Sequence, residues 1–232
     1  MKIDVLDKGY IRLVDSMGDE LSIVNAARVS YDKESTELSD KDIKLLNYLI
    51  ENYHDSVLRH NTMTFEVYAP LLVARQWWKH HVSSTHVEDS NGWNESSRRY
   101  ITENNEYYLP AYDEWRKSPE NSKQGSSGPV SKELGVQLTR LMEKHTEKSE
   151  EIYKEALSCG LAPEQARLFL PAYSLYVRWR WTASLNALLN FLTLRLGSDA
   201  QVEITAYAHA LSTMIDSKYP HVLQAWQKRA GK

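Results

Sequence analysis

Basic and aromatic side chains gather in the stretch ARQWWKHHVSSTHVEDSNGWNESSRRY, residues 74–100. Its cationic and imidazole groups could bind an anion; they are Arg75, Lys79, His80, His81, His86, Arg98 and Arg99. Its indoles could stack on a planar ring; they are Trp77, Trp78 and Trp93. The whole chain carries a formal net charge of −3. Because domains that bind nucleic acid through bulk charge usually have an excess of lysine and arginine, we expect a small anion that is held locally, and no nucleic acid.

A rival interpretation is that the tryptophans stack the bases of a single strand. Trp77 and Trp78 follow Leu71, Leu72 and Val73 in one apolar helical run. At least one of the two indoles is therefore expected in the core, which weakens this alternative.

Three arginines outside the cluster could also bind an anion. Arg28 lies in AARVSY, whereas Arg167 and Arg195 interrupt the apolar segments ARLFLP and FLTLRLG. An unpaired guanidinium in apolar surroundings is costly. Two alternatives stay open: each arginine forms an ion pair with Asp or Glu, or several of them form a phosphate site through bidentate hydrogen bonds.

Other kinds of site are not supported by the residue spacing. His80 and His81 are adjacent, so on a helix they point about 100° apart, and we expect no metal. Cys159 lies in ALSCGLAP without an activating neighbour, so a role as the thiolate nucleophile of a uracil methylase is not expected. The sequence contains no G-x-G-x-x-G loop that would bind a dinucleotide.

Periodicity predicts the elements that must position these residues. Strands are expected as a pair within 2–17, over 62–69, where apolar and polar residues alternate, and over 174–184. Helices are expected over 40–54 after the N-cap Ser39, from Pro70 through 81, over 132–159 up to Gly160, over 185–197 and beyond 198. The long helix would present one apolar face made of Leu134, Leu138, Leu141, His145, Ile152 and Ala156.

This order of elements predicts an α+β fold, with a small, largely antiparallel sheet covered by several helices. The 232 residues, 42% of them apolar and 25% charged, suit a single domain over 1–232. One cysteine excludes an intramolecular disulfide, and the opening MKIDVLDKGY lacks the apolar core of a signal peptide. We therefore expect a cytoplasmic protein, and no apolar run predicts insertion into a membrane.

Five ordered motifs resemble the flavin-dependent thymidylate synthases, the ThyX family: AARVSY, RQWWKHH, NESSRRY, ARLFLP and NFLTLRLGSDAQVEI. The segment EYYLPAYDEWRKSPENSKQGSSG is similar to a loop region of some members. The resemblance implies a homotetramer with FAD held between subunits. It also implies that dUMP is reductively methylated to dTMP, with methylenetetrahydrofolate as the one-carbon donor and NADPH as the reductant of the flavin.

The resemblance also implies the site residues. The implied flavin contacts are Ser30, Ser56, Lys79, His80, His81, Glu95, Ser184, Asn186 and Asn190. The implied nucleotide contacts are Gln76, Lys79, Glu95, Ser96, Ser97, Arg98, Arg99, Arg167 and Arg195. Arg195 would stabilise negative charge at N3 of uracil and so activate C5 without a cysteine, while Ser97 would orient the nucleotide.

The sequence departs from the family pattern at three places. The usual R-H-R triplet is Lys79-His80-His81, twelve residues, 82–93, separate His81 from Asn94, and Asp199 replaces a family histidine. A lysine and a largely neutral histidine are poorer bidentate partners than two arginines. The alternative function is therefore a ThyX-like protein that binds flavin or nucleotide with impaired methyl transfer.

Overall fold

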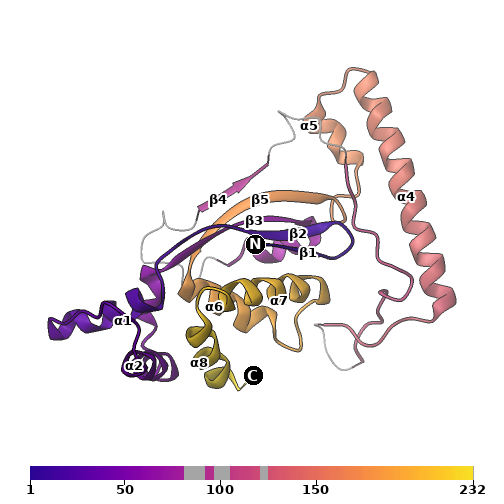
Figure 1. Cartoon of the computed structure of the whole chain (residues 1–232). Coiled ribbons are helices and arrows are strands. Elements are labelled where there is room, and N and C mark those ends of the chain that lie inside the picture. The colour runs from indigo at the N-terminus through magenta and orange to yellow at the C-terminus, as the bar shows by residue number, and fades with distance from the viewer. Residues whose placement is uncertain (81–91, 97–104, 121–124, 232) are drawn as a thin grey trace.

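The computed structural model describes residues 1–80, 92–96, 105–120 and 125–231 (Figure 1). Within them, one five-stranded sheet has the order β1-β2-β3-β5-β4, and every pair of neighbours is antiparallel. The strands are β1 Lys2–Val5, β2 Gly9–Met17, β3 Thr62–Pro70, β4 Gly92–Glu95 and β5 Tyr176–Ser184. The predicted α+β class and antiparallel sheet are confirmed.

The two central strands, β3 and β5, form because their apolar residues alternate, so that one face of each is buried. Met63, Phe65 and Val67 are fully buried in β3, and Trp179 and Trp181 are buried in β5. Side chains of successive strand residues point to opposite faces of the sheet. Arg180, which lies between these tryptophans in β5, therefore points to the opposite face.

Helices cover the sheet and extend beyond it. Figure 1 places α6 and α7 along one face of the sheet, with α8 beyond them. The helices are α1 Glu20–Arg28, α2 Asp40–Glu51, α3 Leu71–Trp77, α4 Lys132–Ser158, α5 Pro163–Ala166, α6 Leu185–Arg195, α7 Val202–Asp216 and α8 Pro220–Ala230, with short 3-10 turns η1 Val29–Tyr31, η2 Asp55–His60 and η4 Arg167–Phe169. Among the described residues, no helix combines the length and the apolarity that crossing a membrane requires.

Local capping signals were predicted well. Ser39 caps α2, and its side chain forms a reciprocal capping box with Asp42. Gly160 follows the end of α4 with a φ of +82°, as the sequence predicted. Pro70 is the N-cap of α3 and the last residue of β3, not a residue of the first helical turn as expected.

The predicted apolar face of α4 is only partly covered in the single chain: Leu138, Ile152 and Ala156 are half-buried, and His145 is exposed. Leu134 is 43% and Leu141 64% exposed, whereas the buried residues of this helix are Gly135, Thr146 and Ser149. Figure 1 shows α4 standing apart from the sheet, beside α5. An amphipathic pattern shows that a helix needs an apolar partner, but it does not show that the partner belongs to the same chain.

Candidate active site

The end of α3 is held against α6 by an aromatic cluster. The Trp77 ring lies 5.5 Å and 5.4 Å from those of Trp179 and Trp181, edge to face in both cases, and 4.6 Å from that of Phe191. Trp77 is 1% exposed, so the expectation that one helical indole belongs to the core is confirmed. This packing brings residues just after α3 next to the last turn of α6.

His80 and Arg195 meet at this junction. Arg195 Nε donates a hydrogen bond of 2.9 Å to His80 Nε2, and the imidazole packs 4.7 Å from the ring of Phe191. His80 is only 6% exposed. Because a guanidinium nitrogen can only donate, Nε2 must accept, which leaves the imidazole neutral with its proton on Nδ1.

Arg195 is a cation at the edge of a pocket of about 410 Å³. Burial lowers its pKa, and the nearby carboxylate of Asp199 acts in the opposite direction. Arginine nevertheless stays protonated in proteins, and the two terminal nitrogens of this side chain are not used by His80. The pocket is lined by Gln76, Arg116, Gly125, Ser126, Leu194, Arg195, Asp199, Ala200 and Gln201.

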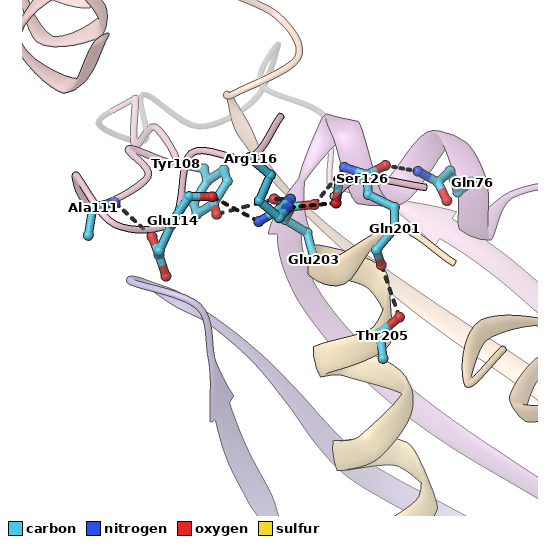
Figure 2. Close-up of polar contacts among 9 residues, drawn as sticks. All are labelled: Gln76, Tyr108, Ala111, Glu114, Arg116, Ser126, Gln201, Glu203 and Thr205. Atoms are coloured by element: carbon cyan, nitrogen blue, oxygen red, sulfur yellow. Dashed lines mark hydrogen bonds and ion pairs between the residues drawn. The ribbon is translucent and has the colours of Figure 1, made fainter. Parts of the chain in front are cut away.

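A row of hydrogen-bonded polar side chains, here called the polar wall, runs along one side of this pocket, and Figure 2 shows its contacts. Gln76 Nε2 donates to Gln201 Oε1, and Gln201 Nε2 donates to Glu203 Oε2 at 2.7 Å. Arg116 reaches Glu203 Oε1 through Nη2 and Ser126 Oγ through Nε. Arg116 and Ser126 belong to the long connection before α4, so this connection contributes directly to the pocket.

Glu203 lies in the first turn of α7 and is 5% exposed. Burial alone would raise the pKa of its carboxyl, but hydrogen bonds from Arg116, its own backbone and Gln201 outweigh this effect and lower it. The hydroxyl of Tyr108 also points to Oε1, at 3.5 Å, and burial raises the pKa of that phenol. Glu203 is therefore ionised at neutral pH and balances the charge of Arg116.

The other two arginines lie elsewhere. Arg28 forms an ion pair with Asp42 and a hydrogen bond with Ser35, so the ion-pair alternative describes it. Arg167 begins η4 and is exposed, and the inference that it lies in apolar surroundings is wrong. Its neighbour Leu168 is 84% exposed, because this short turn lies at the surface. Arg167 does not line the pocket of Arg195.

Other candidate flavin contacts lie on α6 before its last turn and on the turns η1 and η2. Ser184 caps this helix and is buried, and Asn186 and Asn190 share one face of it because they are four residues apart. Ser56 in η2, a turn that contacts α6, and Ser30 in η1, which follows α1, are both exposed. A recess of about 840 Å³ adjoins Ser30 and is lined by Ser22, Asn25, Ala26, Val29, Asp32, Lys33, Glu34 and His60.

The two groups of candidate residues are separated by the length of α6. Eleven residues at 1.5 Å each place Ser184 and Arg195 about 16 Å apart along the helix axis. A small nucleotide could not reach both ends, whereas an extended cofactor or a second subunit could bridge them.

The remaining candidates lie just after α3, in β4 and just after β4. Lys79 and Glu95 are exposed, and the backbone N–H of Ser96 donates to the carbonyl of Arg178 at 2.8 Å. Trp93 stacks on Trp179 at 5.0 Å and meets Trp78 edge to face. Four candidates, His81, Ser97, Arg98 and Arg99, lie outside the described residues.

Cys159 is exposed at the end of α4 and does not line the pocket of Arg195. In the part of the chain that the structure describes, no group of three or more His, Cys, Asp or Glu residues is arranged to hold a metal ion. The site therefore consists of arginines, amides and carboxylates.

Sequence reasoning missed four residues of the polar wall: Arg116, Ser126, Gln201 and Glu203. One signal was available for Glu203, which interrupts the apolar start of a predicted helix, where a carboxylate needs a partner. Arg116 had no such signal, because it lies in a polar, loop-like segment.

Solved structures share this fold over almost the whole chain. The UMP/dUMP methylase PolB from Streptomyces cacaoi, bound with 5-Br UMP, is 28% identical with a TM-score of 0.81, and the match covers 98% of this chain and 97% of that one. A second structure of PolB, bound with 5-Br dUMP, is 30% identical with the same TM-score, covering 97% of both chains. The fold and the arginine-lined pocket therefore define an α+β protein of the class to which this nucleotide methylase belongs.

Sequence comparison identifies the family. The model of the family described as thymidylate synthase complementing protein matches residues 12–221. The flavin-dependent thymidylate synthase of Thermosipho africanus is 40% identical over 232 residues, which is 100% of this chain and 96% of the relative. That of Thermotoga neapolitana is 38% identical over 100% of this chain and 97% of the relative. The chain belongs to the flavin-dependent thymidylate synthases.

Proposed function

We propose that this chain catalyses the reductive methylation of dUMP to dTMP. The observation that carries the proposal is the pocket that is lined by both Gln76 and Arg195, in which His80 orients Arg195 through a hydrogen bond. A full-length relative named as a flavin-dependent thymidylate synthase, at 40% identity, supports the same reaction.

The nucleotide would bind at the Arg195 end of α6. Its phosphate carries a charge of about −1.5 to −2, which two or three guanidinium groups can balance. Arg195 would stabilise negative charge at N3 of the uracil ring, so that C5 becomes nucleophilic without a thiolate. The proposed nucleotide contacts are Gln76, Lys79, Glu95, Ser96, Ser97, Arg98, Arg99, Arg167 and Arg195, with Ser97 orienting the nucleotide.

The flavin is proposed to be FAD. Its ring edge and ribityl chain need hydrogen-bond partners, and the hydroxyls and amides at the start of α6 and on η1 and η2 are groups of this kind. The proposed contacts are Ser30, Ser56, Lys79, His80, His81, Glu95, Ser184, Asn186 and Asn190. When bound, the flavin supplies the hydride, after reduction by NADPH, and methylenetetrahydrofolate supplies the carbon.

We further propose a homotetramer, in which sites are shared between subunits. Arg167 lies outside the pocket of its own chain, on a surface where Leu168 is 84% and Phe169 47% exposed. The exposed leucines of α4 extend the apolar area. A neighbouring subunit would cover these residues and supply its own Arg167 to the nucleotide.

The second candidate function is binding of flavin or nucleotide with impaired methyl transfer. It is favoured by the triplet Lys79-His80-His81, in which a point charge replaces the first of two forked guanidinium groups. The middle residue of the triplet, His80, is the histidine of the usual R-H-R pattern, and it contacts Arg195. The two candidates therefore differ in turnover and not in the presence of the pocket.

A visible absorption spectrum followed by a product assay separates them. The purified chain is supplied with FAD, and its spectrum is recorded before and after addition of dUMP. A flavin band that shifts with dUMP, followed by dTMP formation with methylenetetrahydrofolate and NADPH, is the expected result. A shift without dTMP would support the binding protein, and a chain that takes up neither FAD nor dUMP would contradict both functions.

A further inference from the structure

The carboxylate of Glu203 is the centre of the polar wall shown in Figure 2. Its Oε1 receives Arg116 Nη2 and lies 3.5 Å from the hydroxyl of Tyr108, while its Oε2 receives Gln201 Nε2 at 2.7 Å. Glu203 itself is not among the residues that line the pocket of Arg195. It contacts two residues that do line it, Arg116 and Gln201, so any effect on a ligand must pass through them.

The first path passes through two amides. An ionised carboxylate only accepts hydrogen bonds, so Gln201 must turn its NH₂ group toward Glu203. The carbonyl oxygen of Gln201 is then left to accept from Nε2 of Gln76. Gln76 therefore cannot swap its two ends without breaking this hydrogen bond, and its carbonyl oxygen and second N–H stay available for the pocket.

The second path passes through Arg116. Its Nε donates to Ser126 Oγ at 3.0 Å, and its Nη1 donates to the carbonyl of Glu114, also at 3.0 Å. These two contacts are local, whereas the ion pair with Glu203 spans 87 residues of sequence. The ion pair thus attaches Arg116 and Ser126, two residues of the pocket lining, to the start of α7.

We propose that Glu203 is a positioning residue of the nucleotide pocket, which sets the orientation of the Gln76 amide through Gln201 and holds Arg116 in the pocket wall. The inference rests on the proposed function, because it assumes that Gln76 contacts the nucleotide. It adds a residue that touches neither nucleotide nor flavin but determines which hydrogen-bonding groups the nucleotide meets.

The depressed pKa of the Glu203 carboxyl supports this role, since an acceptor that stays ionised imposes one direction on the amides. A glutamine at position 203 would be nearly the same size but could donate as well as accept. Gln201 could then turn around, and Gln76 would lose its fixed direction. A merely structural role of Glu203 would instead act on stability and would not depend on Gln76.

The test measures dUMP affinity and KM of the FAD-loaded enzyme for four variants: Glu203→Gln, Gln201→Leu, Gln76→Ala and the double variant Glu203→Gln with Gln76→Ala. Glu203→Gln is expected to weaken dUMP binding about tenfold, with FAD affinity unchanged and kcat changed less than KM. Gln201→Leu interrupts the amide path but keeps the ion pair with Arg116, and is expected to weaken binding similarly. Glu143→Gln, on the exposed side of α4, is the matched control.

The double variant decides between the two roles. If Glu203 acts through Gln76, Glu203→Gln weakens dUMP binding much less in the Gln76→Ala background than in the wild type. Equal effects in both backgrounds, or normal dUMP affinity in Gln201→Leu, would overturn the proposal. Should Glu203→Gln not fold, Gln201→Leu alone carries the test. A wild-type enzyme that fails to bind dUMP would overturn the proposed function and, with it, this inference.

Discussion

At the scale of single residues, the site depends on which groups can donate and which can accept. Arg195 can only donate, so it sets the tautomer of His80, and Glu203 can only accept, so it sets the direction of Gln201. Both residues are charged and at least partly buried, and each has its partners in hydrogen-bond range. Polar groups that are ordered in this way need no reorganisation when a ligand binds.

Arg195→Ala is expected to lower dTMP formation by about a hundredfold or more, because one preorganised donor to developing negative charge typically contributes that much. Its melting temperature should stay close to that of the wild type, because the side chain is only partly buried. Turnover and thermal unfolding are measured together, with Arg140→Ala on the exposed side of α4 as the control. Full activity in Arg195→Ala would contradict the role assigned to this residue.

Lys79→Arg, alone and combined with His81→Arg, is expected to tighten binding of dUMP or FAD several-fold. A planar guanidinium forms two parallel hydrogen bonds to a phosphate, whereas an ammonium group acts as a point charge. Titrations of the oxidised flavin spectrum measure both affinities. Unchanged affinities would mean that other residues compensate for the altered triplet.

Acid should weaken the Arg116–Glu203 ion pair. The folded-state pKa of Glu203 is depressed, so its contribution to stability is complete above the unfolded value of about 4.3 and is lost as the pH falls through the lower folded value. The melting temperature of the wild type is therefore expected to fall more steeply below about pH 4.3 than that of Glu203→Gln. Parallel pH profiles of the two proteins would argue against the ion pair as a source of stability.

At the scale of elements, the ends of helices position the site. The last turn of α6 carries Arg195, its N-cap is Ser184, and the start of α7 carries Glu203. The long helix α4 contributes differently: it holds the connection that carries Arg116. Near its start, Gly135 packs so closely on Tyr112 that an added Cβ would lie 1.9 Å from the Tyr112 carbonyl oxygen.

Gly135→Ala tests this packing. Alanine favours a helix over glycine by about 1 kcal/mol, but overpacking a tight contact typically costs about 1–3 kcal/mol. Because the obstacle is backbone, we expect the contact to dominate and the melting temperature to fall. Gly128→Ala is the matched control, since no atom lies within 4 Å of its added Cβ. A more stable Gly135→Ala variant would contradict this expectation, because it would show that the backbone at Tyr112 moves aside at little energetic cost.

At the scale of the whole molecule, one chain does not bring all the candidate residues together. Arg167 lies away from the pocket of Arg195, and the candidate flavin residues lie at both ends of α6. The exposed apolar residues of α4 and η4 are the surfaces that a neighbouring subunit would cover. Assembly and activity should therefore be coupled.

Leu141→Glu is expected to dissociate the proposed homotetramer, because Leu141 is 64% exposed in the single chain and a charge would be buried at the interface. Light scattering after size exclusion measures the mass, and dTMP formation is measured on the same fractions. Glu143→Lys, which is exposed and lies about 200° around α4 from Leu141, is the control. A Leu141→Glu protein with unchanged mass would remove α4 from the proposed interface.

Much of the fold followed from the amino-acid order, because strands and helix ends depend on residues close in sequence. Alternation in β3 and β5, the Ser39 cap and Gly160 were all readable in this way. The motifs likewise identified Gln76, His80 and Arg195 as candidates. What they could not show was how these side chains are paired.

Only the tertiary structure decided those pairs. Arg195 meets His80 across 115 residues of sequence, and Arg116 meets Glu203 across 87. The apolar stripe of α4, readable in the sequence, is only partly covered by its own chain, because Leu134 and Leu141 are exposed. Periodicity depends on neighbours within one or two helical turns, whereas a contact between distant segments depends on how whole elements pack, which no local pattern contains.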